Sequence, residues 1–187
     1  MSWGLKLACL CGVAGPAVAF SLIALALARS PWFSWTANAL SDLGTRAESA
    51  ALFNLGLIAG GGLLCVFAAG LWRSLRGKAL GRAGGLAFLL SAAALCGVGV
   101  FPETAGRIHL YFSLAFFVGL VVALWLVGGA LIQLGERRLG ALVVGASVGA
   151  GAVWALPWPA VAIPEIISSF AAAACSITLG VRLFKRG

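Results

Sequence analysis

The stretch HLYFSLAFFVGLVVALWLVGGALIQL, residues 109–134, decides what kind of protein this chain is. It contains no Asp, Glu, Lys or Arg, and most of its residues are apolar. A helix needs about 20 such residues to cross the hydrocarbon core of a bilayer. It also satisfies its own backbone hydrogen bonds there, where no water is available. The stretch therefore predicts a membrane-spanning helix that begins at His109.

Five more stretches on either side have the same length and character. Their apolar runs are continuous, whereas strands of a membrane β-barrel alternate over about 10 residues. We therefore predict an all-α fold, a polytopic bundle of six transmembrane helices that forms a single domain over residues 1–187. The six predicted spans are Leu7–Ala28, Ala51–Trp72, Ala83–Phe101, His109–Leu134, Gly140–Val161 and Glu165–Leu183.

The composition agrees with a membrane protein. Apolar residues make up 62% of the 187 residues and charged residues only 10%. A soluble domain has roughly 45–50% apolar and about 25% charged residues. These proportions exclude an ordinary water-soluble enzyme and a disordered segment. They also exclude a nucleic-acid module, so we expect no nucleic-acid partner.

The basic residues predict the orientation of the chain. Lys and Arg collect in the cytoplasmic loops of membrane proteins. Ten of the 13 Lys and Arg residues lie at one end of the predicted spans. We therefore predict that both termini lie in the cytoplasm. We expect the chain to be a multi-pass protein of the plasma membrane. Because the whole chain has a net charge of +8, we expect these ten basic residues to face anionic lipid headgroups. The ten are Lys6, Arg73, Arg76, Lys78, Arg82, Arg137, Arg138, Arg182, Lys185 and Arg186.

Glycines spaced four apart mark helix faces that allow close packing. Gly56 and Gly60 share one face of the second span, and Gly145 and Gly149 share one face of the fifth. Small residues let helix backbones approach each other in lipid, where apolar burial between helices gains little. Two interpretations remain open: packing within the bundle, and contact with other membrane subunits through these faces.

The five cysteines all lie within predicted spans and include no C-x-x-C pair. This arrangement supports neither a dithiol redox centre nor a zinc ribbon. We interpret them as small apolar residues.

Polar residues at the predicted outer membrane boundary form the candidate site. The candidates are Ser41, Asp42, Glu103, His109 and Glu165. One imidazole and several carboxylates suit either acid–base chemistry at the lipid interface or a divalent metal, although no ligand spacing such as H-E-x-x-H is present. Ser41 is a candidate polar helper, or a nucleophile activated by His109. Helix capping and pairing with Arg are the structural alternative for each residue.

Three motifs resemble the DUF998 family, a family of six-span prokaryotic membrane proteins with no assigned function. They are Asn38–Gly44 (NALSDLG), Leu52–Leu57 (LFNLGL), and Gly99–Glu103 (GVFPE) with Ile108–Leu110 (IHL). The resemblance covers about residues 38–117 and implies a six-span fold.

Two further likenesses concern lipid chemistry. The layout is loosely similar to that of the Frag1/DRAM/Sfk1 six-span proteins, some of which are implicated in lipid-anchor processing. More distantly it resembles the ceramidase-like superfamily, which binds zinc through several histidines. His109 is the only histidine of this chain, so a three-histidine zinc site within one protomer is impossible.

Three functional hypotheses follow. The first is a lipid-binding or lipid-hydrolysing protein that uses the outer candidate residues, with its enzymatic status and any cofactor left open. The second is a structural or regulatory subunit of a membrane complex. The third, a small-solute carrier, is the weakest. In a carrier, the charged residues that couple transport to an ion normally lie within the spans. No Asp, Glu or Arg lies in the middle of any predicted span of this chain.

Overall fold

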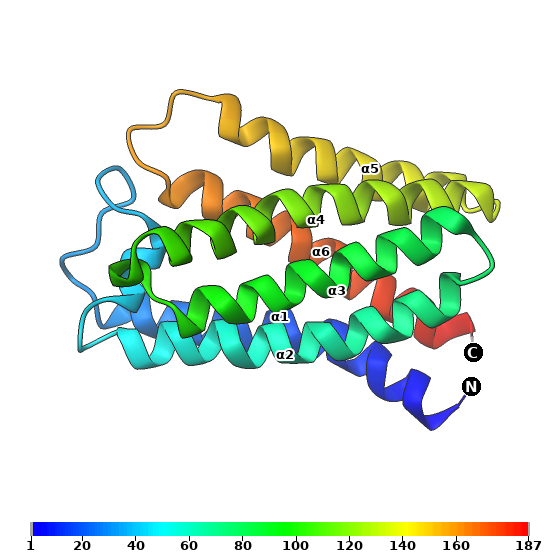
Figure 1. Cartoon of the computed structure of the whole chain (residues 1–187), viewed down its shortest axis with the longest axis horizontal. Helices are drawn as coiled ribbons and strands as arrows, with labels where there is room; N and C mark the ends of the chain where they lie inside the picture. Colours follow the sequence, from blue (N-terminus) through cyan, green and yellow to red (C-terminus); the bar gives the residue numbers. More distant parts are fainter. Residues whose placement is uncertain (1, 187) are drawn as a thin grey trace.

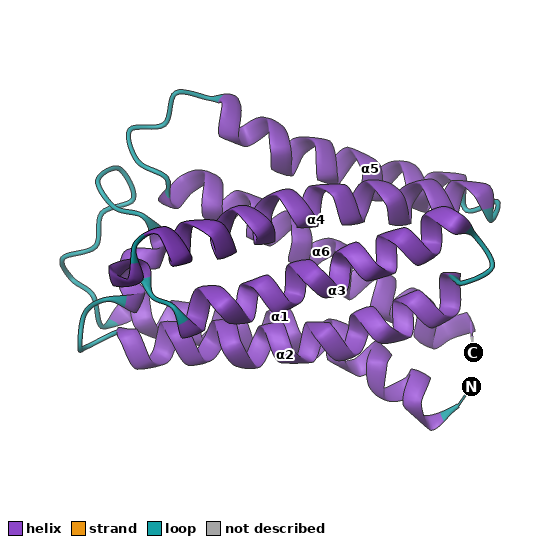
Figure 2. Cartoon of the chain, viewed as in Figure 1, coloured by secondary structure: helices purple, strands orange, loops and turns teal. Residues whose placement is uncertain are grey.

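The computed structural model describes residues 2–186, and within that range it contains helices, turns and loops but no strand (Figures 1 and 2). The predicted all-α fold is confirmed. Short 3₁₀ helices occupy three of the connections: η1 (Leu40–Gly44), η2 (Glu103–Ala105) and η3 (Val153–Ala155). The long helices are α1 (Trp3–Ala28), α2 (Ala50–Leu75), α3 (Ala79–Val100), α4 (Arg107–Gln133), α5 (Arg137–Ala152) and α6 (Ala162–Arg186).

Six helices of the described chain are long and apolar enough to cross a membrane. Five of the predicted spans agree with the helices to within about a turn at each end. The fifth was predicted to run to Val161, and this was wrong: α5 ends at Ala152 and, beyond η3, the backbone is extended at Leu156. Pro157 and Pro159 explain the early end, because proline cannot continue a helix and disfavours helical geometry in the preceding residue.

The helices run alternately up and down, so both termini lie at one end of the bundle (Figure 1). The connections α2–α3 and α4–α5 lie at that same end. The connections α1–α2, α3–α4 and α5–α6, which carry η1, η2 and η3, meet at the other end. All the candidate site residues therefore lie at one end of the molecule, whichever side of the membrane that end faces.

The α1–α2 packing depends on the Gly56/Gly60 face. A Cβ added at Gly60 would lie 2.8 Å from the Ala19 Cβ and 2.9 Å from the Gly15 carbonyl oxygen. A Cβ at Gly56 would lie 2.9 Å from the Leu22 Cβ. This face is therefore covered by α1 of the same chain and is not available to another subunit.

The second glycine pair behaves differently. Gly145 and Gly149 on α5 have no atom within 4 Å of an added Cβ, and both residues are exposed. In this chain the two pairs share a spacing and differ in environment.

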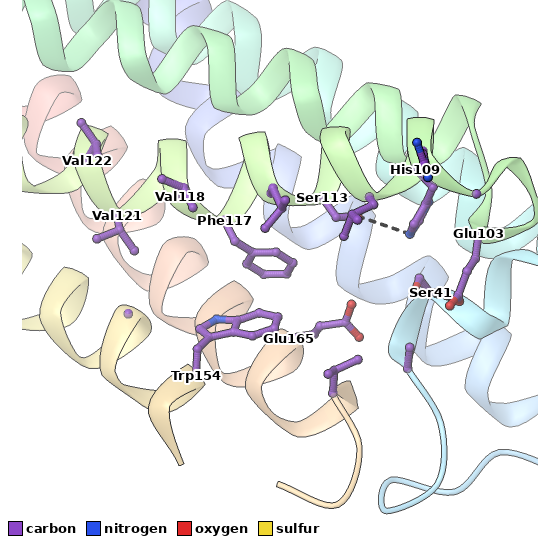
Figure 3. Close-up of a pocket in the computed structure, with 17 residues that line it drawn as sticks. Ser41, Glu103, His109, Ser113, Phe117, Val118, Val121, Val122, Trp154 and Glu165 are labelled. Atoms are coloured by element: carbon purple, nitrogen blue, oxygen red, sulfur yellow. Dashed lines mark hydrogen bonds between the residues drawn. The ribbon is translucent and has the colours of Figure 1, made fainter. Parts of the chain in front are cut away.

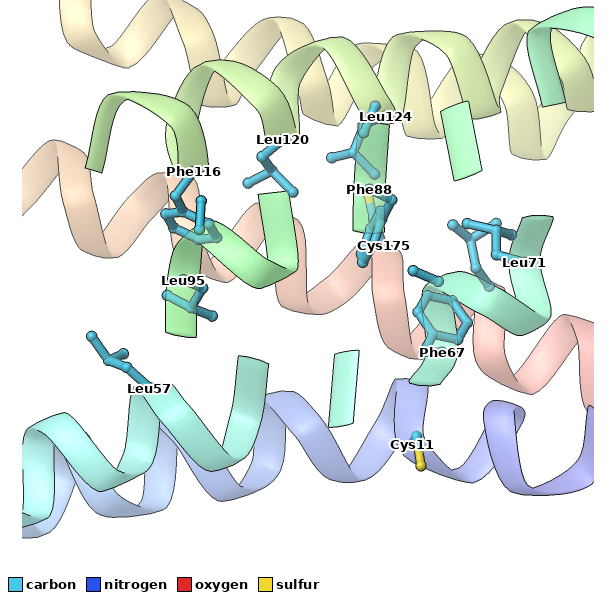
Figure 4. Packing of buried hydrophobic residues seen from close by; sticks show 14 of the residues in the cluster. Cys11, Leu57, Phe67, Leu71, Phe88, Leu95, Phe116, Leu120, Leu124 and Cys175 are labelled. Atoms are coloured by element: carbon cyan, nitrogen blue, oxygen red, sulfur yellow. The ribbon is translucent and has the colours of Figure 1, made fainter. Parts of the chain in front are cut away.

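The interior of the bundle is apolar and closely packed. Phe67 of α2 and Phe88 of α3 meet edge to face, with ring centroids 5.5 Å apart, next to buried leucines of α2 and α4 (Figure 4). The cysteines are free thiols, and Cys9, Cys11 and Cys175 are buried, as expected for small apolar residues.

Serine hydroxyls also join the helices. Ser91 donates to a carbonyl of α4 at 2.8 Å, Ser147 to another carbonyl of α4 at 2.7 Å, and Ser176 to a carbonyl of α1 at 2.8 Å. At the end that carries the termini, the Arg182 guanidinium of α6 makes a bidentate ion pair with Glu136, the residue that precedes α5. Interhelical hydrogen bonds of this kind add to close packing in holding helices together in a membrane.

Candidate functional site

Asp42 stabilises the short helix η1. Its Oδ2 accepts hydrogen bonds from the Ala39 backbone N–H at 3.0 Å and from the Asn38 side-chain amide at 2.8 Å. A carboxylate in this position satisfies a backbone donor that the start of a helix leaves without a partner. The Asp42 side chain thereby holds the loop in the shape that presents its neighbour, Ser41.

Glu165 joins η1 to α6 across 125 residues of sequence. Its Oε2 accepts a hydrogen bond from the Leu40 backbone N–H at 2.6 Å. The sequence places this carboxylate in the first turn of its own helix, where the helix dipole favours negative charge. The structure adds a second role, because the same carboxylate ties the α1–α2 loop to the top of α6.

Glu103, at the start of η2, faces η1. Its Oε2 accepts a hydrogen bond from the Ser41 hydroxyl at 3.2 Å. Partial burial of the carboxyl raises the pKa of Glu103, and the neighbouring Asp42 carboxyl raises it further through a hydrogen bond and like charge. The Ser41 hydroxyl and His109 oppose this rise in pKa. The structure thus brings Ser41, Asp42, Glu103 and His109 together from three separate segments.

His109 lies in the first turn of α4 and is buried. Its Nδ1 lies 2.8 Å from the Phe101 carbonyl oxygen, and its Nε2 lies 3.3 Å from the Ser113 hydroxyl. A carbonyl oxygen can only accept, so Nδ1 carries a proton. In the neutral ring, Nε2 therefore accepts from Ser113.

Ser113 was not among the residues predicted from the sequence, where Ser41 was the predicted partner of His109. The available signal was their spacing: residues four apart on a helix lie on the same face. The structure places the Ser41 hydroxyl against Glu103 instead.

A cavity of about 860 Å³ opens beside these residues, between α4, α5 and α6 (Figure 3). Its polar end is lined by Ser41, Glu103, Arg107, His109, Ser113 and Glu165. Asp42 does not line it. Of the acidic candidates, Glu103 and Glu165 are therefore the two that face the cavity.

The rest of the cavity is an apolar groove along α4, which we call the α4 groove. Its α4 side is formed by Leu110, Leu114, Phe117, Val118, Val121 and Val122. Phe117 meets Trp154 of η3 edge to face, with ring centroids 4.8 Å apart, and the two rings form part of the cavity wall. Val118 is 59% exposed and Leu114 is 52% exposed. The groove is therefore open toward the surface that a membrane would cover.

The described residues, 2–186, contain no group of three or more His, Cys, Asp or Glu side chains that could hold a metal ion. The site offers two carboxylates, an oriented imidazole, two hydroxyls and a guanidinium around one opening.

Residues 13–182 match the sequence model of a family described as a protein of unknown function (DUF998). The chain belongs to the DUF998 family. The match extends well beyond residues 38–117, to which the motif resemblance was limited. No curated protein matches the chain, and no solved structure does. In this DUF998 protein, the motifs at residues 38–44 and 99–110 supply η1, η2 and the start of α4, and so most of the polar end of the cavity.

Proposed function

We propose that this DUF998 protein binds a membrane lipid, with the headgroup at the polar end of the cavity and an acyl chain in the α4 groove. One observation carries the proposal. The cavity of about 860 Å³ is polar at the membrane boundary and apolar along a membrane-spanning helix. An amphiphile has the same division, and apolar pockets with a few convergent polar groups are typical ligand sites.

The dimensions of the α4 groove support this proposal. From Leu110 to Val122 a helix rises about 18 Å at 1.5 Å per residue. One leaflet of the hydrocarbon core is about 15 Å deep, half of the total of about 30 Å. A groove of this length can hold most of one acyl chain of a lipid whose headgroup remains at the boundary.

The polar end supports recognition of a headgroup. It presents the carboxylates of Glu103 and Glu165, the guanidinium of Arg107 and the hydroxyls of Ser41 and Ser113. Hydrogen bonds to charged groups are stronger than those between neutral ones. These groups offer both donors and acceptors, as a polar or zwitterionic headgroup requires.

The carrier hypothesis receives less support. The central cavity between α1, α2, α3, α4 and α6 measures only about 60 Å³, and no charged residue lines it. A pathway for a polar solute needs polar or charged groups through the bundle.

A role as a membrane subunit is the second candidate. It is favoured by the open Gly145/Gly149 face of α5 and by an adjacent apolar hollow of about 490 Å³ between α5 and α6. Small residues on an uncovered helix face are typical of helix–helix contacts in membranes.

Native mass spectrometry of the full chain, titrated with dioleoyl phosphatidylethanolamine, tests the lipid proposal. Val118→Trp fills the α4 groove, whereas Val148→Trp places the same side chain on an exposed part of α5 outside the cavity. We expect wild type and Val148→Trp to bind one lipid with the same affinity. We expect Val118→Trp to bind at least about tenfold more weakly, a loss of about 1.4 kcal/mol. Equal binding by all three proteins would refute the site.

A further inference from the structure

Ser113 and His109 have the arrangement of a nucleophile and its base. The Ser113 hydroxyl lies 3.3 Å from Nε2, and the opposite ring nitrogen is held by the Phe101 carbonyl at 2.8 Å. An activated serine needs a base within hydrogen-bond reach and a third group that orients that base. Here all three components are present within one turn of α4 and the residue that follows α3.

The hydrogen bond of Ser113 differs from the usual one for a serine in a helix. Such hydroxyls commonly donate to a backbone carbonyl of the preceding turn. Ser74 does so, with its hydroxyl 2.9 Å from the Leu71 carbonyl oxygen. The Ser113 hydroxyl faces an imidazole nitrogen instead.

The pair lies where the two parts of the cavity meet. His109 and Ser113 line the polar end, and Leu114 and Phe117 begin the α4 groove. Figure 3 shows Ser113 between His109 and Phe117 along α4. In an ester-linked lipid with its headgroup at the polar end and its acyl chain in the α4 groove, the acyl ester lies between the two parts. That bond would lie next to Ser113.

We infer that Ser113 is the nucleophile, and His109 its base, in an acyl-transfer reaction on an ester-linked lipid. The inference deepens the proposed lipid-binding function and rests on it. Neither residue alone would carry it. The oriented pair, its place in the cavity and the amphiphilic shape of that cavity together point to this reaction.

The reaction has two balanced steps. Ser113 Oγ bonds to the ester carbonyl carbon while its proton moves to His109 Nε2. The bond to the alcohol oxygen then breaks, and the alcohol leaves with that proton, which gives acyl-Ser113. Water attacks the acyl group in the same way, giving its proton to His109. The fatty acid is released and the Ser113 hydroxyl recovers its proton.

Glu103 assists by its charge. Glu103 and His109 both line the polar end of the cavity, and His109 acts to lower the pKa of Glu103 against the rise caused by burial and by Asp42. When the Glu103 carboxyl is ionised, its negative charge attracts a protonated His109. The imidazolium that forms during each step is therefore stabilised from the direction of η2. Glu103 acts through His109 and is a positioning residue.

An alkyl fluorophosphonate tests the nucleophile directly. It phosphonylates an activated serine hydroxyl with loss of fluoride, and intact-mass and peptide mass spectrometry locate the adduct. We expect one adduct on Ser113 in the full chain and none in Ser113→Ala. We expect labelling at least about 100-fold slower in His109→Gln, in line with removal of a general base. Ser74→Ala removes a helical serine at the other end of the bundle and should label like wild type.

The outcomes separate this inference from the proposed lipid binding. Lipid bound by wild type and by Ser113→Ala, together with a labelled Ser113, supports both. Lipid bound without any adduct on Ser113, or equal labelling of Ser113→Ala, overturns the acyl-transfer inference alone. A labelled Ser113 in a chain that binds no phospholipid overturns the lipid site and leaves only a reactive serine.

Discussion

Gly60→Ala should destabilise the bundle, because the added methyl group meets atoms that cannot move away cheaply. Its Cβ would lie 2.8 Å from the Ala19 Cβ and 2.9 Å from the Gly15 carbonyl oxygen, both belonging to α1. Overpacking of this kind costs about 1–3 kcal/mol. Alanine regains up to about 1 kcal/mol in helix propensity. We expect a net loss near 1 kcal/mol, or roughly a fivefold shift in the unfolding equilibrium.

Gly149→Ala is the matched control. It makes the same chemical change on α5, where an added Cβ meets no atom within 4 Å. Only helix propensity acts there, so this variant should unfold with a free energy equal to that of wild type or higher by up to about 1 kcal/mol.

Circular dichroism during titration of mixed micelles with sodium dodecyl sulfate measures both variants. We expect Gly60→Ala alone to unfold at a lower fraction of sodium dodecyl sulfate than wild type. A Gly60→Ala protein as stable as wild type would show that the α1–α2 contact is looser than the structure places it. Equal losses in both variants would show that the Gly149 face is also covered.

Three more predictions concern the rest of the molecule. In the folded protein the pKa of Glu103 is raised above its ordinary value of 4.5. Glu103 therefore contributes to the stability of the fold at low pH, and this contribution is lost as the pH rises through the raised pKa. Glu103→Gln should therefore flatten the fall of the unfolding free energy with rising pH in the same titration. Glu136→Gln should cost about 1–3 kcal/mol by weakening the ion pair with Arg182, and a double-mutant cycle with Arg182→Gln should show coupling between the two. In intact cells, in a background without the native cysteines, a membrane-impermeant maleimide should label Thr104→Cys and not Arg76→Cys, and the reverse pattern would invert the predicted orientation.

The six spans were predictable from the sequence because length and apolar content alone define them. Their ends were less predictable. α5 stops at Ala152, well before the predicted end, because Pro157 and Pro159 interrupt an apolar stretch that otherwise resembles a span. The family was also predictable from short motifs, which turned out to be part of a match over residues 13–182.

The polar contacts were not predictable to the same degree. Five candidate residues were predictable at one end of the bundle, and the structure shows how they are paired. The Ser41 hydroxyl donates a hydrogen bond to Glu103. His109 is hydrogen-bonded to Ser113 and not to Ser41. Asp42 caps η1 and does not line the cavity.

The sequence by itself determined that the chain crosses a membrane six times and that four of its five acidic residues share one end with its single histidine. Tertiary structure alone decided which glycine face is covered and that the Leu40 backbone N–H donates a hydrogen bond to Glu165. It also decided that an apolar groove lies along α4 next to His109. The physical reason is the solvent. In lipid, the residues that face outward are as apolar as those that face inward, so the sequence of a span does not reveal how the helix is rotated. Only packing against its neighbours sets that rotation, and with it the side chains that meet.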